Sequence, residues 1–360
     1  MKIAICADIH ARGKDLPALD AQLKAMTREV QKRGVSVLCI AGDVFDRASI
    51  GDSHASTGAI VKPMMDFVLE LNGDGIDPII IPGNHDYSGP SCRDALHVFD
   101  ASSVLVPRGE DWNDGRKWSD RMGLTLITVP WMYEENAEAW ITDRIRRAKE
   151  AFVNMPSILV GHIRVTGGRM NGNQTYDGTT GWTVSRAFLE SLPVDHIALG
   201  DFHGRQELVP GKGGYVGALR QCNFGEEGNP AGFEIWDSET GVTEWVELDA
   251  APKHRTVCCQ PSNIVPPERR GNELLRVRYE GGIPAASEIK AFEDLGAVVE
   301  VMVPAQERLT RAAEDVSGAL SDPHRLYDIW GDAQTPAPPH DQRLRQHAAL
   351  SELLDGKAAA

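Results

Sequence analysis

Five short polar motifs follow one another along the chain, and each begins where an apolar run typical of a β-strand ends. The motifs are Asp8-Ile9-His10, Gly42-Asp43-Val44-Phe45-Asp46, Gly83-Asn84-His85-Asp86, Gly161-His162 and Gly200-Asp201-Phe202-His203. The apolar runs are residues 3–7, 35–41, 79–82, 158–160 and 196–199. Ligands of open α/β sheets bind in the crevice outside the carboxyl ends of the strands. Five strand ends that deliver Asp, Asn or His to one such edge predict a metal-dependent enzyme.

The segments between these strands predict helices that cover the sheet. Residues 16–33 have apolar side chains at a 3.6-residue period and are followed by Gly34, which predicts a helix. Further helices are predicted at residues 57–71 and 135–153. The strands are continuous apolar runs, as in a sheet that is covered on both faces. Later segments are short and contain glycine, which predicts hairpins in a second sheet packed on the first, at residues 214–219, 232–236 and 242–248.

The composition changes near residue 250, where we place the end of a first domain, residues 1–250. Residues 250–267 contain four prolines and are predicted as a linker. The next segments predict a small α+β domain within residues 251–331, with a strand, a helix and a strand at 273–279, 286–295 and 297–303. A proline-rich break then opens a C-terminal tail, residues 332–360, with an amphipathic helix over 341–354. The pattern leaves open whether this helix docks on a partner or is a frayed end.

Composition limits the class of protein. The length of 360 residues and the hydrophobic content of 42% allow a large core and a second, smaller unit. The sequence contains no run of about 18 apolar residues, so no membrane span is predicted. The first residues enter a strand without the features of a secretory signal, and the six cysteines show no CxxC spacing. We therefore expect a reduced, cytoplasmic protein, or one of the host cytoplasm if the chain is viral.

The formal net charge of −15 argues against a chain that binds nucleic acid through its overall field. Part of the acidic excess would belong to carboxylates that bind metal ions. Binding of DNA would then require local basic patches or the help of a partner.

The motifs contain the side chains that two-metal hydrolysis needs, namely a bridging carboxylate and separate oxygen and imidazole ligands for each ion. Asp8 and His10 are two residues apart at a strand end, so their side chains can point to the same side. Asp43 follows Gly42, whose missing side chain permits close approach of the backbone. Asn84 adds an amide oxygen beside His85. By contrast, His196 lies inside a predicted strand and is expected to pack in the core.

With these motifs in this order, the chain resembles the calcineurin-like metallophosphoesterases. Within that superfamily it is similar to the SbcD-type nuclease subunits, in the stretches HIRVTGG (162–168) and HIALGDFHG (196–204) and in residues 214–233. The last stretch contains Gly217-Ala218-Leu219 and Asn223-Phe224-Gly225-Glu226. The resemblance covers residues 1–250 well and the region after residue 273 only loosely. It implies an α/β protein, a four-layer α/β/β/α sandwich with a small DNA-binding cap domain and a C-terminal helical tail.

The resemblance also implies roles for the motif residues. The first metal ion would be held by Asp8, His10, Asp43 and His203. The second would share Asp43 and be completed by Asn84, His162 and Asp201. His85 would stabilise charge on the phosphate or protonate the leaving oxygen, with Asp86 as its orienting partner. Asp46 would fix the geometry of a ligand.

Position 201 departs from the family pattern, which has His where this chain has Asp201. A carboxylate is still a competent ligand, and its hard oxygen favours Mn²⁺ or Mg²⁺ over softer ions. The added negative charge is expected to reduce the Lewis acidity of the site.

Substrate contacts are predicted near the metal ligands. Arg12 and Arg47 follow ligand motifs and could contact phosphate. Arg164, Arg169 and Tyr176 lie in or beside the glycine-rich segment 167–181, where they could contact phosphate or stack on a base. An ordinary loop without such a role is the alternative for this segment.

These observations lead to a hypothesis of function. The chain is expected to be a Mn²⁺-dependent DNA nuclease with two divalent ions, Mg²⁺ being the alternative metal. The resemblance implies 3′-to-5′ exonuclease and endonuclease activity in DNA repair or recombination, a homodimer, and an SbcC-type ATPase partner. The alternative is a calcineurin-like phosphodiesterase that acts on cyclic nucleotides or other small esters. A non-catalytic scaffold is suggested by Asp201 alone, and the intact Asn84-His85 pair argues against it.

Overall fold

The computed structural model describes residues 1–47, 54–87, 94–100, 102–108, 119, 122–133, 136–170, 174–178, 181–260, 272–280, 284–294 and 296–302. The chain divides into two compact units. The first comprises Met1–Thr256 and Arg269–Leu275, and the second comprises Val257–Glu268 and Arg276–Ala360. The predicted tail, residues 332–360, lies outside the described residues. No helix among those described is long and apolar enough to cross a membrane.

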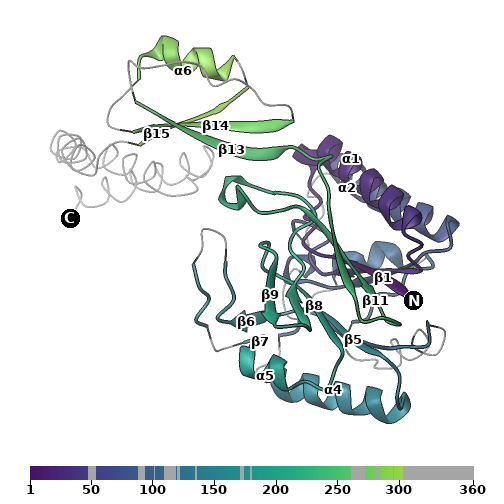
Figure 1. Ribbon diagram of the computed structural model, residues 1–360. Helices are drawn as coiled ribbons and strands as arrows, with labels where there is room; N and C mark the ends of the chain where they lie inside the picture. The colour runs from purple at the N-terminus through teal and green to yellow at the C-terminus, as the bar shows by residue number, and fades with distance from the viewer. Residues whose placement is uncertain are drawn as a thin grey trace, which may run out of the picture. The chain divides into compact units, whose positions relative to one another are not determined.

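The first unit contains two five-stranded sheets (Figure 1). The first sheet has the order β12-β11-β1-β2-β3. Its strands are β1 (Lys2–Cys6), β2 (Val37–Ala41), β3 (Asp77–Ile81), β11 (Gly232–Asp237) and β12 (Thr243–Glu247). The second sheet has the order β4-β5-β8-β10-β9. Its strands are β4 (Thr125–Val129), β5 (Ser157–His162), β8 (His196–Gly200), β9 (Gln206–Val209) and β10 (Gly213–Tyr215).

Within each sheet, the strands that carry the motifs are parallel to one another. In the first sheet β2 pairs in parallel with both β1 and β3, and in the second β8 pairs in parallel with β5. Their carboxyl ends therefore lie at one edge of each sheet. The motifs are divided between these two edges, and they come together because the two edges adjoin.

Helices cover the outer faces of both sheets, and this produces four layers. One apolar cluster joins α1 (Leu16–Lys32) and α2 (His54–Gly73) to the first sheet, and another joins α4 (Ala137–Ala151) and α5 (Arg186–Ser191) to the second. A third cluster fills the space between the sheets. In β1, Ile3 and Ile5 face the other sheet, whereas Ala4 and Cys6 pack toward the helices, as the period of two requires. The predicted α/β/β/α arrangement is confirmed.

Two details of the predicted sheets are wrong. The five motif strands do not form one sheet, because β1, β2 and β3 belong to the first and β5 and β8 to the second. The late hairpin-like segments do not form a sheet of their own, because β10 joins the second sheet while β11 and β12 extend the first. An apolar run indicates burial on both faces but does not specify which strand will lie beside it.

Short elements connect the sheets to the helices. They are β6 (Arg164–Thr166), β7 (Thr183–Ser185) and the 3-10 helices Gly13–Asp15, Asn84–Asp86, Ala95–Phe99 and Phe224–Glu226. The helices predicted within the described residues are present with small shifts of their ends. The start of α4, for example, is set by Asn136, whose side chain accepts a hydrogen bond from the backbone N–H of Ala139.

A third sheet contains much of the described part of the second unit. Its order is β13-β14-β15, formed by Lys253–Cys259, Glu273–Glu280 and Val298–Met302, and α6 spans Ala286–Glu293. The prediction of a linker over residues 250–267 is wrong in part, because β13 lies within it. The prolines that suggested a linker flank this strand and do not interrupt it.

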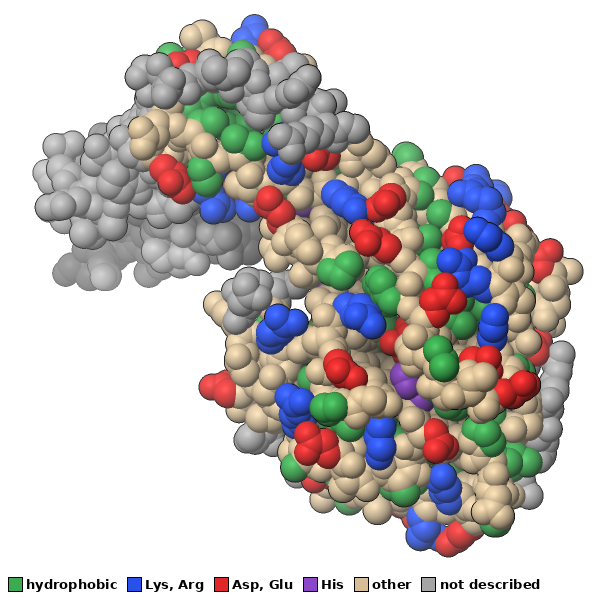
Figure 2. All heavy atoms as spheres, viewed as in Figure 1, with side chains coloured by type: hydrophobic (Ala, Val, Ile, Leu, Met, Phe, Trp, Pro, Cys, Tyr) green, Lys and Arg blue, Asp and Glu red, His purple; other side chains and the backbone are tan. Residues whose placement is uncertain are grey.

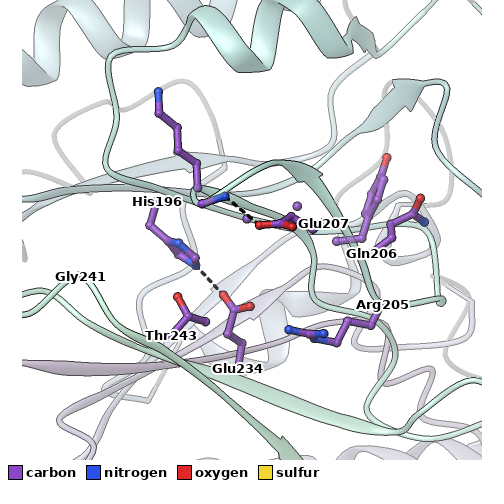
Figure 3. Close-up of a pocket in the computed structure, with 12 residues that line it drawn as sticks. His196, Arg205, Gln206, Glu207, Glu234, Gly241 and Thr243 are labelled. Atoms are coloured by element: carbon purple, nitrogen blue, oxygen red, sulfur yellow. Dashed lines mark hydrogen bonds and ion pairs between the residues drawn. The ribbon is translucent and has the colours of Figure 1, made fainter.

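A buried polar pair joins the two sheets of the first unit (Figure 3). His196 begins β8 in the second sheet, and its Nε2 lies 2.5 Å from Oε1 of Glu234, which belongs to β11 in the first sheet. His196 is only 3% exposed, and its ring stacks on Trp236 at a centroid distance of 5.4 Å. His196 is therefore a core residue, as predicted, and it also forms a polar connection between the sheets.

Glu234→Ala should lower the free energy of unfolding by about 1–3 kcal/mol, because it leaves the buried His196 ring without its partner. Urea denaturation would measure the loss. Glu234→Gln is the matched control, since it keeps an acceptor and should cost less. Equal stability of Glu234→Ala and wild type would show that the pair contributes nothing net.

Candidate metal centre

Four candidate metal ligands have backbone conformations that residues other than glycine rarely adopt. Asp8, His10, Asp43 and Asp201 have φ values of 53°, 46°, 53° and 108°. Asn154 is the other non-glycine residue with positive φ in the described part of the chain. Such conformations cost energy and are held by their surroundings, often at functional sites. The strand ends are therefore bent to aim these four side chains.

Two glycines allow the edges of the two sheets to approach. A Cβ on Gly42, which follows β2, would overlap the ring of His162 at the end of β5, and the φ of Gly42 is 91°. A Cβ on Gly200, at the end of β8, would overlap the carbonyl oxygen of Ala41 in β2. The motif glycines thus permit contact between the sheets at the point where the polar side chains converge.

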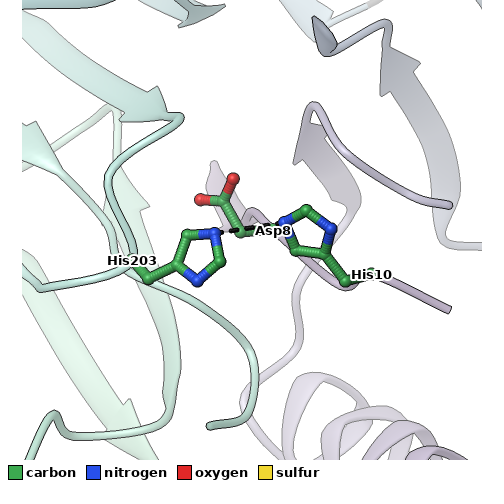
Figure 4. Close-up of side chains that lie close together, drawn as sticks. All are labelled: Asp8, His10 and His203. Carbon is green, nitrogen blue, oxygen red and sulfur yellow. Dashed lines mark hydrogen bonds between the residues drawn. The ribbon is translucent and has the colours of Figure 1, made fainter. Parts of the chain in front are cut away.

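The first cluster consists of Asp8, His10 and His203 (Figure 4). The Nε2 atoms of His10 and His203 face each other at 3.1 Å. His10 follows β1 of the first sheet, and His203 follows β8 of the second. The Asp8 carboxylate offers an oxygen within 4.8 Å of both rings. Burial, together with the neighbouring imidazoles His203 and His85, lowers the pKa of His10 to about 2. The His10 ring is therefore neutral and can provide a nitrogen lone pair.

The second cluster converges on Nε2 of His162. This atom lies 3.0 Å from Oδ1 of Asn84, 3.5 Å from Oδ2 of Asp43 and 3.7 Å from Oδ1 of Asp201. The residues come from β5, the loop after β3, the loop after β2 and the end of β8. One imidazole nitrogen and three oxygens at these distances could surround a cation.

The carboxylate of Asp43 is shared by the two clusters. Its Oδ2 lies 3.6 Å from Nε2 of His10 and 3.5 Å from Nε2 of His162. Its Oδ1 accepts a hydrogen bond of 2.8 Å from the backbone N–H of His85. A carboxylate in this position could bridge two metal ions.

The electrostatics of the centre favour bound cations. Burial raises the pKa of Asp8 to about 7. Burial opposes protonation of His162, yet the carboxylates of Asp43 and Asp8 raise its pKa to about 9. Burial also raises the pKa of Asp201, which shows the cost of an uncompensated carboxylate here. A crowded, buried set of anions and imidazoles is the donor set that divalent ions stabilise.

Two buried atoms in the centre are without a hydrogen-bond partner among the described residues. They are Nδ1 of His10 and Oδ2 of Asp201. Buried polar atoms are normally paired. Together with the donor set, these orphaned atoms fit a centre that binds metal ions.

Two of the candidate ligand imidazoles, His162 and His203, are oriented through a second contact. Nδ1 of His162 lies 2.9 Å from the carbonyl oxygen of Ala41. Nδ1 of His203 lies 2.9 Å from Oε1 of Glu226, whose other oxygen accepts the backbone N–H of Cys222 at 2.8 Å. Such contacts fix the tautomer and the direction of a metal-binding imidazole. Glu226 lies in a segment that resembles the family, but no role was predicted for it, because no feature of the neighbouring sequence links it to His203.

His85 lies at the open side of the centre. It is exposed, its Nδ1 is 2.8 Å from the carbonyl oxygen of Asp46, and its ring is perpendicular to that of His10 at a centroid distance of 4.8 Å. His10, Asp43 and His85 also offer donor atoms within 4.8 Å of one another. Asp46 has a carboxylate oxygen 3.6 Å from Nδ1 of His10.

The prediction that Asp86 orients the His85 ring is not met. The Asp86 carboxylate is buried and accepts backbone N–H groups of Gly83 at 2.8 Å and Phe45 at 3.1 Å. Burial raises its pKa to about 7. Asp86 therefore ties together the loops after β2 and β3, and the ring of His85 is held by the backbone of Asp46.

The predicted substrate contacts have mixed surroundings. Arg12 is engaged by Asp15 and by the carbonyl oxygen of Cys222, whereas Arg47 is exposed. The guanidinium of Arg164 lies over the Trp131 ring at 5.0 Å, with Nε 3.5 Å from Oδ2 of Asp201.

The glycine-rich segment holds the other two predicted contacts. Tyr176 packs edge-on against Phe202 at 5.6 Å and shares a hydrogen bond of 3.2 Å with the hydroxyl of Thr183. Arg169 is exposed, and its backbone pairs with the side chain of Gln206. Of the predicted substrate contacts, Arg164 thus pairs with a candidate metal ligand, Asp201.

Comparisons with known proteins identify the family of the chain. Residues 1–205 match the calcineurin-like phosphoesterase family. Exonuclease subunit 1 of Enterobacteria phage T4 is 27% identical over 222 residues, which are 60% of this chain and 57% of that protein. The chain therefore spans little more than half the length of this relative.

Two solved structures are similar at a lower level. A hypothetical protein of Pyrococcus horikoshii OT3 has a TM-score of 0.33 and 14% identity, covering 69% of this chain and 88% of the other. A dimetal phosphatase of Danio rerio has a TM-score of 0.37 and 12% identity, covering 65% of this chain and 91% of the other.

Asp201→Ala should weaken binding of one metal ion and leave the other bound, because the Asp201 carboxylate lies in the cluster around Nε2 of His162. Isothermal titration with Mn²⁺ would resolve the two sites. Asp201→His should restore the weakened site, since imidazole is also a ligand for these ions. Two ions bound by Asp201→Ala with wild-type affinity would remove Asp201 from the ligand set.

Proposed function

The chain belongs to the calcineurin-like phosphoesterase family and is a metal-dependent hydrolase, and on this premise we propose that it is a DNA nuclease that uses two divalent ions. The observation that carries the proposal is the position of Asp43, whose Oδ2 faces the His10 cluster on one side and the His162 cluster on the other. A shared carboxylate between two donor sets is what two-metal hydrolysis of a phosphodiester requires.

In this proposal the predicted ligands hold the two ions. Asp8, His10 and His203 hold the first, Asn84, His162 and Asp201 hold the second, and Asp43 bridges them. When bound, the ions supply Lewis acidity toward a phosphate oxygen and lower the pKa of water. The hard oxygens in the second set favour Mn²⁺, with Mg²⁺ as the alternative.

His85 acts on the leaving group in this proposal. The carbonyl of Asp46 can only accept, so the Nδ1 of His85 donates to it and Nε2 is left for the substrate. The backbone N–H of His85 is bound to Oδ1 of Asp43, so the ring stands at a fixed place beside the bridging carboxylate. A protonated His85 could then stabilise charge on the phosphate or give a proton to the leaving oxygen.

The choice of DNA as the substrate is supported by the similarity to an exonuclease subunit. Because that relative is a subunit, we also propose that this protein works in an assembly. An SbcC-type ATPase and a second copy of this chain are the proposed partners, and DNA repair or recombination in the cytoplasm is the proposed setting. Residues 1–250 would form the nuclease domain, residues 251–331 the cap and residues 332–360 a docking tail.

The wild-type protein should degrade linear duplex and single-stranded DNA with Mn²⁺ and lose this activity in EDTA. His85→Ala should lower turnover by about 10²–10⁴-fold, the usual contribution of a general acid or base, while binding two ions as the wild type does. Gel analysis of labelled DNA and metal analysis of the purified variants would measure both.

A cyclic nucleotide supplies the comparison substrate. Hydrolysis of the cyclic nucleotide with no attack on DNA would contradict the proposed substrate and favour a small-ester phosphodiesterase. Loss of a metal ion in His85→Ala would instead make His85 a ligand.

A further inference from the structure

Two arginines of the first unit, Arg169 and Arg205, have no carboxylate within 4 Å among the described residues. Most described guanidinium groups do have one, namely those of Arg12, Arg33, Arg108, Arg146, Arg147, Arg164, Arg186, Arg220, Arg255, Arg276 and Arg278. Arg28 and Arg47 also have no such partner in the described part of the chain, but of these four only Arg169 and Arg205 share a cavity. Figure 2 shows the general pattern, with basic and acidic side chains interspersed over the surface.

Both arginines line one cavity of about 290 Å³. Its other walls are formed by glycines, by polar residues such as Asn229, and by the apolar Met170 and Pro230. The lining contains one carboxylate, that of Glu227, and its Oε1 is engaged by the backbone N–H of Thr256 at 2.9 Å. Two arginines and one hydrogen-bonded carboxylate therefore line the cavity.

The cavity adjoins the metal centre through the chain itself. Gly204 and Arg205 directly follow His203, and two residues span at most about 7 Å. Gly225 and Glu227 flank Glu226, the residue that holds the His203 ring. A ligand in the cavity would thus lie beside the centre without occupying it.

Each arginine is held in place. Arg205 lies over the Trp245 ring at 4.8 Å, and it also borders the cavity of about 370 Å³ that contains His196 and Glu234 (Figure 3). The backbone N–H of Arg169 donates to Oε1 of Gln206 at 2.8 Å, and Nε2 of Gln206 donates back to the Arg169 carbonyl at 2.9 Å. This two-way pair ties the segment after β6 to the start of β9, so the backbones of Arg169 and Arg205 remain at the same cavity.

We propose that this cavity is a subsite for a second phosphate of a polynucleotide strand, bound by Arg169 and Arg205. The inference rests on the proposed function and adds a second phosphate-binding place beside the metal centre. Guanidinium groups recognise phosphate with charge-assisted hydrogen bonds. A strand carries a phosphate at every nucleotide, so it can place one at the metal centre and the next in the cavity. An ester with a single phosphate cannot fill both places.

The test compares a short single-stranded oligonucleotide with bis-p-nitrophenyl phosphate, which has one phosphate. For Arg205→Ala the ratio of kcat/KM between the oligonucleotide and the small ester should fall about tenfold, the effect of one lost charged hydrogen bond. Arg169→Ala should act in the same direction. Arg147→Ala is the matched control, because Arg147 is an exposed arginine on α4 that pairs with Asp143, and it should leave the ratio unchanged.

Binding of a labelled oligonucleotide in EDTA provides a readout that does not need activity. Arg205→Ala should reduce the dependence of log K on log salt by about 0.7, the effect of one phosphate contact on a single strand. An unchanged slope and an unchanged ratio would overturn the subsite, and so would an equal loss on both substrates. Binding of inorganic phosphate that is lost in Arg205→Ala, while the variant binds the oligonucleotide as the wild type does, would overturn the subsite and assign the cavity to free phosphate.

The two proposals fail separately. A wild-type protein that hydrolyses neither substrate with Mn²⁺ would contradict the proposed function. The salt dependence of oligonucleotide binding would still decide whether the cavity binds a strand.

Discussion

The Asp43 carboxylate lies buried where the edges of two sheets meet, and the arrangement of the centre depends on it. Its Oδ2 lies within 3.6 Å of an imidazole nitrogen in each of two clusters, while its Oδ1 anchors the backbone of His85. Asp8 and Asp201 add further carboxylates in the same place, and burial raises the pKa of both. Such a concentration of buried negative charge is unfavourable unless cations compensate it. We infer that the strained ligand backbones and the close contact of the sheets serve to hold metal ions.

The four-layer fold explains how distant motifs reach one point. Parallel pairing places the carboxyl ends of β1, β2 and β3 at one edge of the first sheet and those of β5 and β8 at one edge of the second. Apolar side chains between the sheets keep the edges in register. Glycines at the edges then let Gly42 and the His162 ring come into contact. Each layer has a packing role, and the polar groups of the centre lie at the strand ends and in the turns that follow them.

Much of this could be predicted from the sequence, for identifiable reasons. Polar residues that follow apolar runs indicate strand ends, and this was enough to bring Asp8, His10, Asp43, Asn84, His162, Asp201 and His203 together. The division of the strands between two sheets could not be predicted, because an apolar run does not reveal its neighbour. Glu226 was missed as the partner of His203 because the contact spans 23 residues. Asp86 was misassigned because its backbone contacts depend on how two loops pack.

Anomalous diffraction from crystals grown with Mn²⁺ would test the central claim most directly. We expect two peaks about 3.5–4 Å apart, the spacing of two-metal sites, with an Asp43 carboxylate oxygen between them. A single peak, or two peaks that do not share Asp43, would contradict the account.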